Sequence, residues 1–229
     1  MDILEAIRNR HSVRKYMDTP LPTDIVDKLR EKIDELNREG NLHIQLVTDE
    51  PKAFRGILAY GSFSGVRNYF VIAGRKSDSL DERAGYYGEK LVLYAQTLGL
   101  NTCWVGLSYR KISGTFTLAP DEKVVCYIAL GYGITQGVSH KTRSIEQLSN
   151  VGTDTPAWFR DGVEAARLAP TAINQQKFFF RYIAPDKPGD KAHVLAERGR
   201  SLAGYTRVDL GIARMHFEIG AGRDNFDWT

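Results

Sequence analysis

The strongest constraint on the fold is an alternation of amphipathic helical segments with apolar strand segments, which occurs twice along the chain. In the first part, helical stretches at residues 22–39 and 85–98 enclose strand-like stretches. In the second part, helical stretches at 156–168 and 204–219 enclose the apolar strand FFFRYI at 178–183. Elements of this kind bury one face of each helix against a sheet. We interpret the repeated order helix, strand, helix as an internal duplication, although the two parts share little sequence identity.

The same hydrophobic periodicity assigns the remaining elements. It predicts a short helix at 2–9, a candidate helix at 51–60, and strands at 42–47, 68–74 and 124–133. A polar linker, rich in Gly, Ser and Thr, separates the two parts at 134–155.

Composition narrows the class of protein. The chain has 229 residues, of which 42% are hydrophobic and 26% charged, as is usual for a globular protein. Its 31 basic and 28 acidic residues leave a net charge of +3, which does not indicate a nucleic-acid-binding protein. No apolar run is long enough to span a membrane, and the first ten residues lack a signal-peptide core. Cys103 and Cys126 lie in apolar runs without metal-ligand spacing, so we expect buried, reduced thiols in a cytoplasmic protein.

A basic segment, RNRHSVRKY at 8–16, directly follows the first predicted helix. In an extended segment the alternating residues Arg10, Ser12 and Arg14 point to one side. Two guanidinium groups and a hydroxyl on one side can clamp a phosphate or a polar ring edge. The alternative is a solvated basic turn at a helix C-terminus, which is the commoner use of such a run.

An amide-rich segment, LAPTAINQQ at 168–176, connects a predicted helix to a buried strand. Pro170 can end the helix, and the turn then places Thr171, Asn174 and Gln176 at the start of the strand. Side-chain amides carry both donors and acceptors, which match the edge of a heterocycle. The alternative is a turn that satisfies its own backbone, which accounts for one or two of these residues.

Two further segments carry candidate ligand contacts. In NTCWVG at 101–106, Gly106 would let a flat ligand approach the backbone, and the alternative is an ordinary buried strand. In SHKTRS at 139–144, Lys141 and Arg143 alternate shortly after a strand, and the alternative is an exposed charged loop.

Together these four segments resemble the motifs of the FMN-dependent nitroreductase family. The family pattern Arg-Arg/His-Ser-x-Arg is similar to RHSVRKY, and Ala-Pro-Ser/Thr-Ala-x-Asn-x-Gln is similar to APTAINQQ. The chain departs from the family at Lys177 and Phe178, where Pro and Trp are usual. The other two matches are LGLNTCWVG at 98–106 and LAPDEKVVCYIALGYG at 118–133 with its downstream basic residues.

The order of the motifs is unusual for this family. In ordinary members the Ala-Pro-Ser/Thr motif follows the Arg-Ser-Arg motif closely, but here DELNREGN at 34–41 stands in that place. Ordinary members are intertwined homodimers that build each flavin site from both chains. The chain most resembles the tandem, pseudo-dimeric subgroup of nitroreductases, in which a second half replaces the partner subunit. We therefore expect a monomer with one FMN site between its halves, although a homodimer stays open.

The resemblance implies an α+β fold (an α/β sandwich), with a mixed, mainly antiparallel sheet flanked by helices and an internal duplication that mimics the family dimer. Residues 1–150 would form the half that carries the phosphate clamp. Residues 151–229 would supply the amide-rich wall, and both halves would form one compact unit.

The resemblance also implies roles for individual residues. Arg10, Ser12, Lys141 and Arg143 would hold the phosphate and ribityl groups of FMN, and Arg14 would lie nearer the pyrimidine edge. Thr171, Asn174 and Gln176 would bond the ribityl chain or the ring edge. The remaining expected contacts are His11, Cys103, Trp104, Val105, Gly106, Pro170 and Ala172. We expect no catalytic side chain and no metal, because the flavin supplies the redox chemistry.

The implied activity is transfer of hydride from NAD(P)H through FMN to nitroaromatics, quinones or similar small acceptors. The sequence does not select NADH over NADPH. One alternative is an FMN-binding protein with a non-reductase role, such as a sensor or a flavin carrier, because it would need the same binding residues. A nucleic-acid-binding module is disfavoured, since no motif for nucleic-acid binding is present.

Overall fold

The first part of the chain forms a four-stranded antiparallel sheet with the strand order β1-β2-β4-β3. Its strands are β1 (Gln45–Val47), β2 (Asn68–Arg75), β3 (Asn101–Val105) and β4 (Glu122–Gly131). The structure is a computed structural model that describes residues 1–55, 63–187, 189–200 and 204–229. The central strands β2 and β4 are almost wholly buried, because both faces of the sheet are covered.

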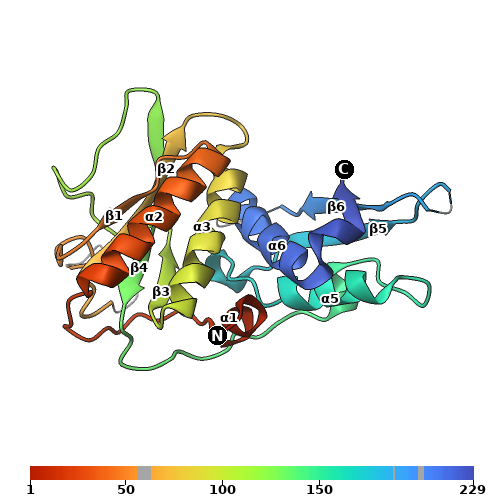
Figure 1. Ribbon diagram of the computed structural model, residues 1–229, viewed down its shortest axis with the longest axis horizontal. Coiled ribbons are helices and arrows are strands. Elements are labelled where there is room, and N and C mark those ends of the chain that lie inside the picture. Colours follow the sequence, from red (N-terminus) through yellow and green to blue (C-terminus); the bar gives the residue numbers. More distant parts are fainter. Residues whose placement is uncertain (56–62, 188, 201–203) are drawn as a thin grey trace.

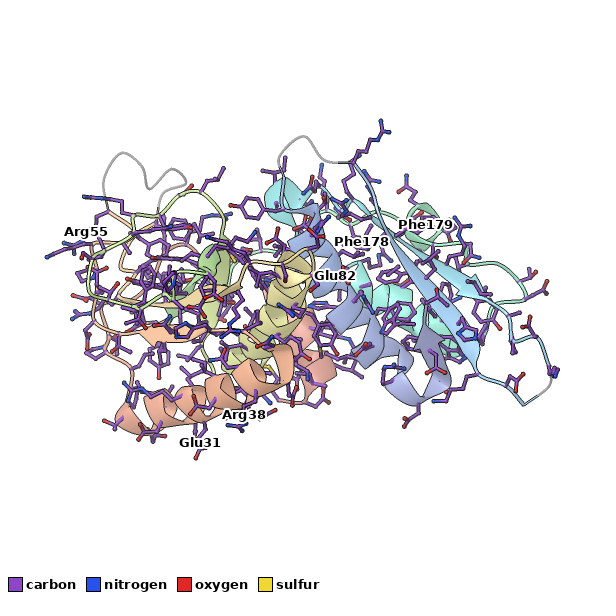
Figure 2. The ribbon with its side chains drawn as sticks, turned by 90° about the horizontal axis from the view of Figure 1, so that it is seen from above. Glu31, Arg38, Arg55, Glu82, Phe178 and Phe179 are labelled. Carbon is purple, nitrogen blue, oxygen red and sulfur yellow. The ribbon has the colours of Figure 1, made fainter. Side chains whose placement is uncertain are left out.

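Helices cover one face of this sheet. The helices α2 (Thr23–Gly40) and α3 (Leu80–Thr97) share an apolar core with β2 and β4. Figure 2 shows Glu31 and Arg38 on the outer side of α2, as its amphipathic pattern predicts. The other face buries a second cluster, in which Tyr69 and Tyr127 stack with their ring centroids 5.0 Å apart.

The second part contributes a smaller sheet with the order β5-β6-β7. The strands β5 (Phe178–Ile183) and β6 (Ala192–Arg198) pair antiparallel, and β7 (Phe226–Trp228) joins β6 in parallel. Two long helices accompany this sheet, α5 (Ala157–Ala166) and α6 (Thr206–Ala221). The shorter elements are α1 (Ile3–Asn9), α4 (Ile145–Leu148), η1 (Ala172–Asn174) and η2 (Arg223–Asn225).

The helices α3 and α6 join the two parts and lie side by side at the centre of an elongated molecule (Figure 1). Glycines allow their backbones to touch. A Cβ atom added at Gly85 would lie 2.0 Å from the carbonyl oxygen of Val208, and one added at Gly211 would lie 2.0 Å from that of Glu82. Figure 2 places Glu82 at this junction, where its carboxylate pairs with Arg214. The crossing therefore fixes α6 against the first part.

The predicted α+β fold, with mainly antiparallel sheets flanked by helices, is confirmed, and both cysteines are buried and unpaired. The prediction missed β6 and β7, and also α4, which lies inside the expected linker. The helix expected at 85–98 begins earlier, at Leu80. Within the described residues, no helix is long and apolar enough to cross a bilayer.

The helix expected at 51–60 is not formed over its described residues, 51–55, which make a turn. The carboxylate of Glu50 accepts hydrogen bonds from the backbone N–H groups of Lys52 and Ala53, both at 2.9 Å, and so stabilises the turn. The rest of that prediction falls on residues 56–60, which lie outside the described residues.

Candidate functional site

A cavity of about 280 Å³ lies between the first part of the chain and the start of α6. The first part supplies Ser12, Arg14 and the segment 104–108 at the end of β3. The second part supplies the turn 170–173 and one face of α6. A concave site with apolar walls and a few polar groups is the usual form of a small-ligand site. This cavity is the candidate functional site.

The basic segment runs in an extended conformation along the edge of β3. Ser12 forms a parallel bridge with Thr102, and the N–H of Val13 donates to the carbonyl oxygen of Thr102 at 3.0 Å. Because side chains alternate in an extended segment, Val13 is buried in the core while Ser12 and Arg14 line the cavity. Arg14 is exposed and makes no ion pair with the described residues. A free cation therefore stands at the cavity.

Arg10 does not line the cavity, because its side chain turns into the protein and is only 3% exposed. Its Nε atom lies 3.7 Å from Oε1 of Glu89 and has no hydrogen-bond partner among the described residues. Burial lowers the pKa of Arg10, and the nearby Glu89 carboxylate opposes that shift.

Glu89 is the centre of a buried polar network that reaches the cavity wall. Its Oε2 accepts from the indole N–H of Trp104 at 2.8 Å, and Trp104 lines the cavity. Its Oε1 lies 2.9 Å from Nε2 of His216, whose Nδ1 lies 3.1 Å from the carbonyl oxygen of Ala165. Both ring nitrogens of His216 thus lie within hydrogen-bond distance of an oxygen atom. The network ties β3 to α3 and α6.

The amides of the turn bond to a neighbouring loop. The side chains of Asn174 and Gln176 each donate to the carbonyl oxygen of Lys141 at 2.9 Å. The Oε1 atom of Gln176 also accepts from the N–H of Arg143 at 2.8 Å. Neither Asn174 nor Gln176 lines the cavity. The structure therefore brings the amide-rich segment 168–176 and the segment 139–144 together. The amide side chains, however, bond to the backbone of the segment 139–144 and do not face the cavity.

Pro170, Thr171 and Ala172 do line the cavity, as do Val105 and Gly106. The hydroxyl of Tyr205 donates to the carbonyl oxygen of Gly106 at 2.6 Å and closes the cavity on that side. The turn and the end of β3 therefore face one another across the cavity.

The other predicted contacts lie away from the cavity. Cys103 points into the core on the opposite side of β3 from Trp104, and burial raises the pKa of its thiol. His11 is half-buried, and its Nδ1 has no hydrogen-bond partner among the described residues. The side chains of Lys141 and Arg143 do not line the cavity.

Sequence reasoning missed the contribution of α6. Three residues of this helix line the cavity, namely Val208, Asp209 and Ile212. Tyr205, which directly precedes the helix, lines it too. The predicted helix at 204–219 contains Val208 and Ile212, whose apolar side chains line the cavity. Asp209 lies between them on the same face, and a charged residue on a buried helix face is the signal that could have revealed it.

Asp209 is the one acidic side chain among the described residues that lines the cavity. It is only 2% exposed, and burial raises its pKa to about 6, against the effect of the hydrogen bonds that it accepts. Its Oδ1 accepts from the N–H of Ala172 at 2.9 Å, and its Oδ2 accepts from Nε2 of Gln175 at 2.6 Å. A carboxylate on α6 thus holds the turn that forms the neighbouring wall.

Comparison with known proteins relates the chain to nitroreductases. The model of a family described as "Putative TM nitroreductase" matches residues 2–221. A "putative nitroreductase" from Thermotoga maritima has a solved structure that is 26% identical, with 98% of this chain and 85% of that chain covered and a TM-score of 0.62.

Two further relatives extend this comparison. A "putative nitroreductase" from Desulfovibrio desulfuricans, solved in complex with FMN, is 20% identical and covers 68% of this chain and 98% of that chain. Its TM-score is 0.51, and at this identity the likeness concerns the fold alone. A "Putative NADH dehydrogenase/NAD(P)H nitroreductase" from Methanothermobacter thermautotrophicus is 26% identical over 121 residues, which are 47% of this chain. The match spans 62% of the length of that curated relative.

Proposed function

We propose that the chain, which belongs to the nitroreductase family described as "Putative TM nitroreductase", is an FMN-dependent oxidoreductase of the cytoplasm. It would take hydride from NADH or NADPH and pass electrons to a nitroaromatic, a quinone or a similar small acceptor. The observation that carries this proposal is the cavity, in which the cation and hydroxyl of the basic segment face the turn and α6 of the second part.

The residues present fit FMN. Arg14, Ser12 and Thr171 offer a cation and two hydroxyls, while Trp104 and Ile212 offer apolar surface for a flat ring. The buried Nδ1 of His11 lacks a hydrogen-bond partner among the described residues, and a buried polar atom without a partner favours a ligand near this segment.

Bound FMN would supply the hydride and electron transfer itself. The chain itself would bind and orient FMN and the substrates, and would exclude water from them. Arg14 would place a positive charge near the ring and so stabilise the negative charge that the ring gains on reduction. Ser12 and Thr171 would donate or accept hydrogen bonds with ribityl hydroxyls.

Other basic residues would neutralise the phosphate. Lys141 and Arg143 are the candidates, with His11 as a neighbouring contact, whereas Arg10 is buried beside Glu89. Lys141 is exposed and makes no ion pair with the described residues, so its ammonium group is available. Asn174 and Gln176 would act by holding the 141–143 backbone beside the turn, since their amides bond there.

We further propose that the two parts, residues 1–150 and 151–229, arose by internal duplication. The order α2, β1, β2, α3 returns as α5, β5, β6, α6, and each strand pair is antiparallel. The second part would replace the partner subunit of an ordinary family dimer. A chain of this kind would be a monomer with one FMN per chain.

Steady-state oxidation of NADH and of NADPH by the FMN-loaded protein tests the proposal. Nitrofurazone and menadione serve as acceptors, and FMN without protein serves as the blank. We expect acceptor-dependent oxidation of at least one nucleotide. Bound FMN that neither nucleotide reduces would refute the reductase function and leave a flavin-binding role.

A further inference from the structure

The turn at the cavity adopts a strained backbone conformation. Three of its non-glycine residues have left-handed backbones, namely Ile173 (φ +49°), Asn174 (φ +56°) and Gln176 (φ +46°). This region is costly for a β-branched residue such as Ile173. The side chain of Ile173 is 81% exposed, so its own burial does not stabilise the turn. Within the turn, the N–H of Asn174 donates to the carbonyl oxygen of Thr171 at 2.9 Å, and the N–H of Gln176 donates to Oγ1 of Thr171 at 3.1 Å. Further hydrogen bonds come from neighbouring elements and join the turn to the rest of the protein.

The hydrogen bonds from neighbouring elements come from two sides of the turn. On one side the turn bonds to the 141–143 segment, which is part of a loop. On the other side it bonds to Asp209, on a helix packed tightly against α3. Of these two supports, only Asp209 lies on a long helix, and its carboxylate is almost completely buried.

We propose that Asp209 is the positioning residue of the candidate site. Its carboxylate fixes the turn 170–176 against α6, so that Thr171 and Ile173 face the ligand. A carboxylate suits this task because both of its oxygens accept, and the turn presents two donors, the N–H of Ala172 and the amide of Gln175. No other acidic side chain among the described residues lines the cavity.

The side chain of Gln175 makes the fit more specific. Its Nε2 also donates to the carbonyl oxygen of Gly204 at 3.0 Å, so the amide group cannot rotate to offer its oxygen without losing that bond. Asp209→Asn therefore leaves one acceptor for two donors. We expect the turn to detach from α6 at the Gln175 contact and to sample other conformations.

The first arm of the test uses the protein without FMN. Amide hydrogen exchange, resolved by NMR, is measured for Asp209→Asn and for Gln175→Ala. We expect the amide of Ala172 to exchange at least about tenfold faster in both variants, while the amides of residues 210–217 in α6 keep their protection. This contrast separates a local positioning role from a general loss of stability.

Glu218→Gln is the matched control. Glu218 lies on the same helix, ~13 Å further along its axis. Like Asp209, it accepts two hydrogen bonds, which in its case come from the side chains of Tyr86 and Trp228. It lies outside the cavity. We expect this variant to leave exchange in the turn unchanged.

The second arm rests on the proposed function and measures FMN affinity by fluorescence titration. We expect the Kd to rise about tenfold in Asp209→Asn and to stay unchanged in Glu218→Gln. Wild-type exchange and wild-type affinity in both site variants would overturn the inference. If the wild-type protein binds no FMN, the proposed function fails, and the exchange arm alone decides whether Asp209 positions the turn.

Discussion

The hydroxyl of Tyr205 donates a hydrogen bond of 2.6 Å to the carbonyl oxygen of Gly106, and so joins the start of α6 to the end of β3. A Cβ atom added at Gly106 would lie 2.6 Å from Cζ of this tyrosine. The sequence predicts that Gly106 leaves room for a flat ligand. In the structure the ring of Tyr205 fills that room, and any ligand must lie beside it.

Tyr205→Phe removes this hydrogen bond and keeps the ring. We expect the free energy of unfolding to fall by about 1 kcal/mol, as is usual for one lost hydrogen bond. Urea denaturation measures the change. Tyr182→Phe is the control, since the hydroxyl of Tyr182 makes no hydrogen bond with the described residues and its loss should cost less than about 0.5 kcal/mol. Equal effects in the two variants would contradict the assigned contact.

Arg14→Gln removes the free cation of the cavity. We expect FMN binding to weaken by about 2 kcal/mol, which is typical of a charge-assisted contact, while thermal stability is kept because Arg14 has no ion pair to lose. Fluorescence titration with FMN measures the affinity. Arg8→Gln removes an exposed cation from α1, outside the cavity, and should leave the affinity unchanged. A similar loss in both variants would indicate a general charge effect instead.

Glu89→Gln tests the buried network. A carboxamide has one acceptor, so it cannot serve both Trp104 and His216, and it leaves Arg10 without a nearby anion. We expect a loss of about 3–5 kcal/mol in the free energy of unfolding, as is seen when one partner of a buried ion pair is removed.

The matched control for that variant is Glu39→Gln. Glu39 pairs with Lys90 at 3.0 Å on the surface, where an ion pair contributes less than about 1 kcal/mol. Guanidinium denaturation compares the two. A Glu89→Gln protein as stable as the Glu39→Gln protein would show that the network adds no stability.

The pKa of Asp209 predicts a pH dependence of stability. Burial raises this pKa from its usual 3.8 to about 6, so the folded protein holds the proton more tightly than the unfolded chain does. The resulting stability is present in full below pH 3.8 and is lost as the pH rises through 6.

Comparison of the wild-type protein with Asp209→Asn isolates this effect, because the amide does not titrate. The difference in free energy of unfolding, wild type minus variant, should fall by about 2–3 kcal/mol between pH 4 and pH 7. Urea denaturation at several pH values measures it. A difference that stays constant over this range would exclude a raised pKa at Asp209.

The hydrophobic pattern of the sequence predicted those helices and strands in which the periodicity is continuous. Val208 and Ile212 share the buried stripe of α6, and the apolar run 68–74 is a central strand, because such signals depend only on neighbouring residues. The strand β7 spans only Phe226–Trp228, which is too short for a periodic signal. The cavity role of Tyr205 depends on the crossing of α3 and α6, and this contact between distant segments leaves no local pattern.

In the amide-rich turn, too, the sequence predicted the local feature but not the contacts with distant residues. Its residue types predicted a polar wall beside a buried strand, and Thr171 lines the cavity. The bonds of Asn174 and Gln176 to Lys141 could not be predicted, because an amide side chain can pair with any backbone group that tertiary packing brings within reach.

We propose one FMN site per chain, built between its two parts. The most direct measurement is an anaerobic FMN titration of the purified protein, followed by absorbance, with the mass of the complex determined by light scattering. We expect one FMN per chain at a mass near 25.8 kDa, and flavin bands that bleach when NADH or NADPH is added. No FMN binding, or one FMN shared by two chains, would contradict it.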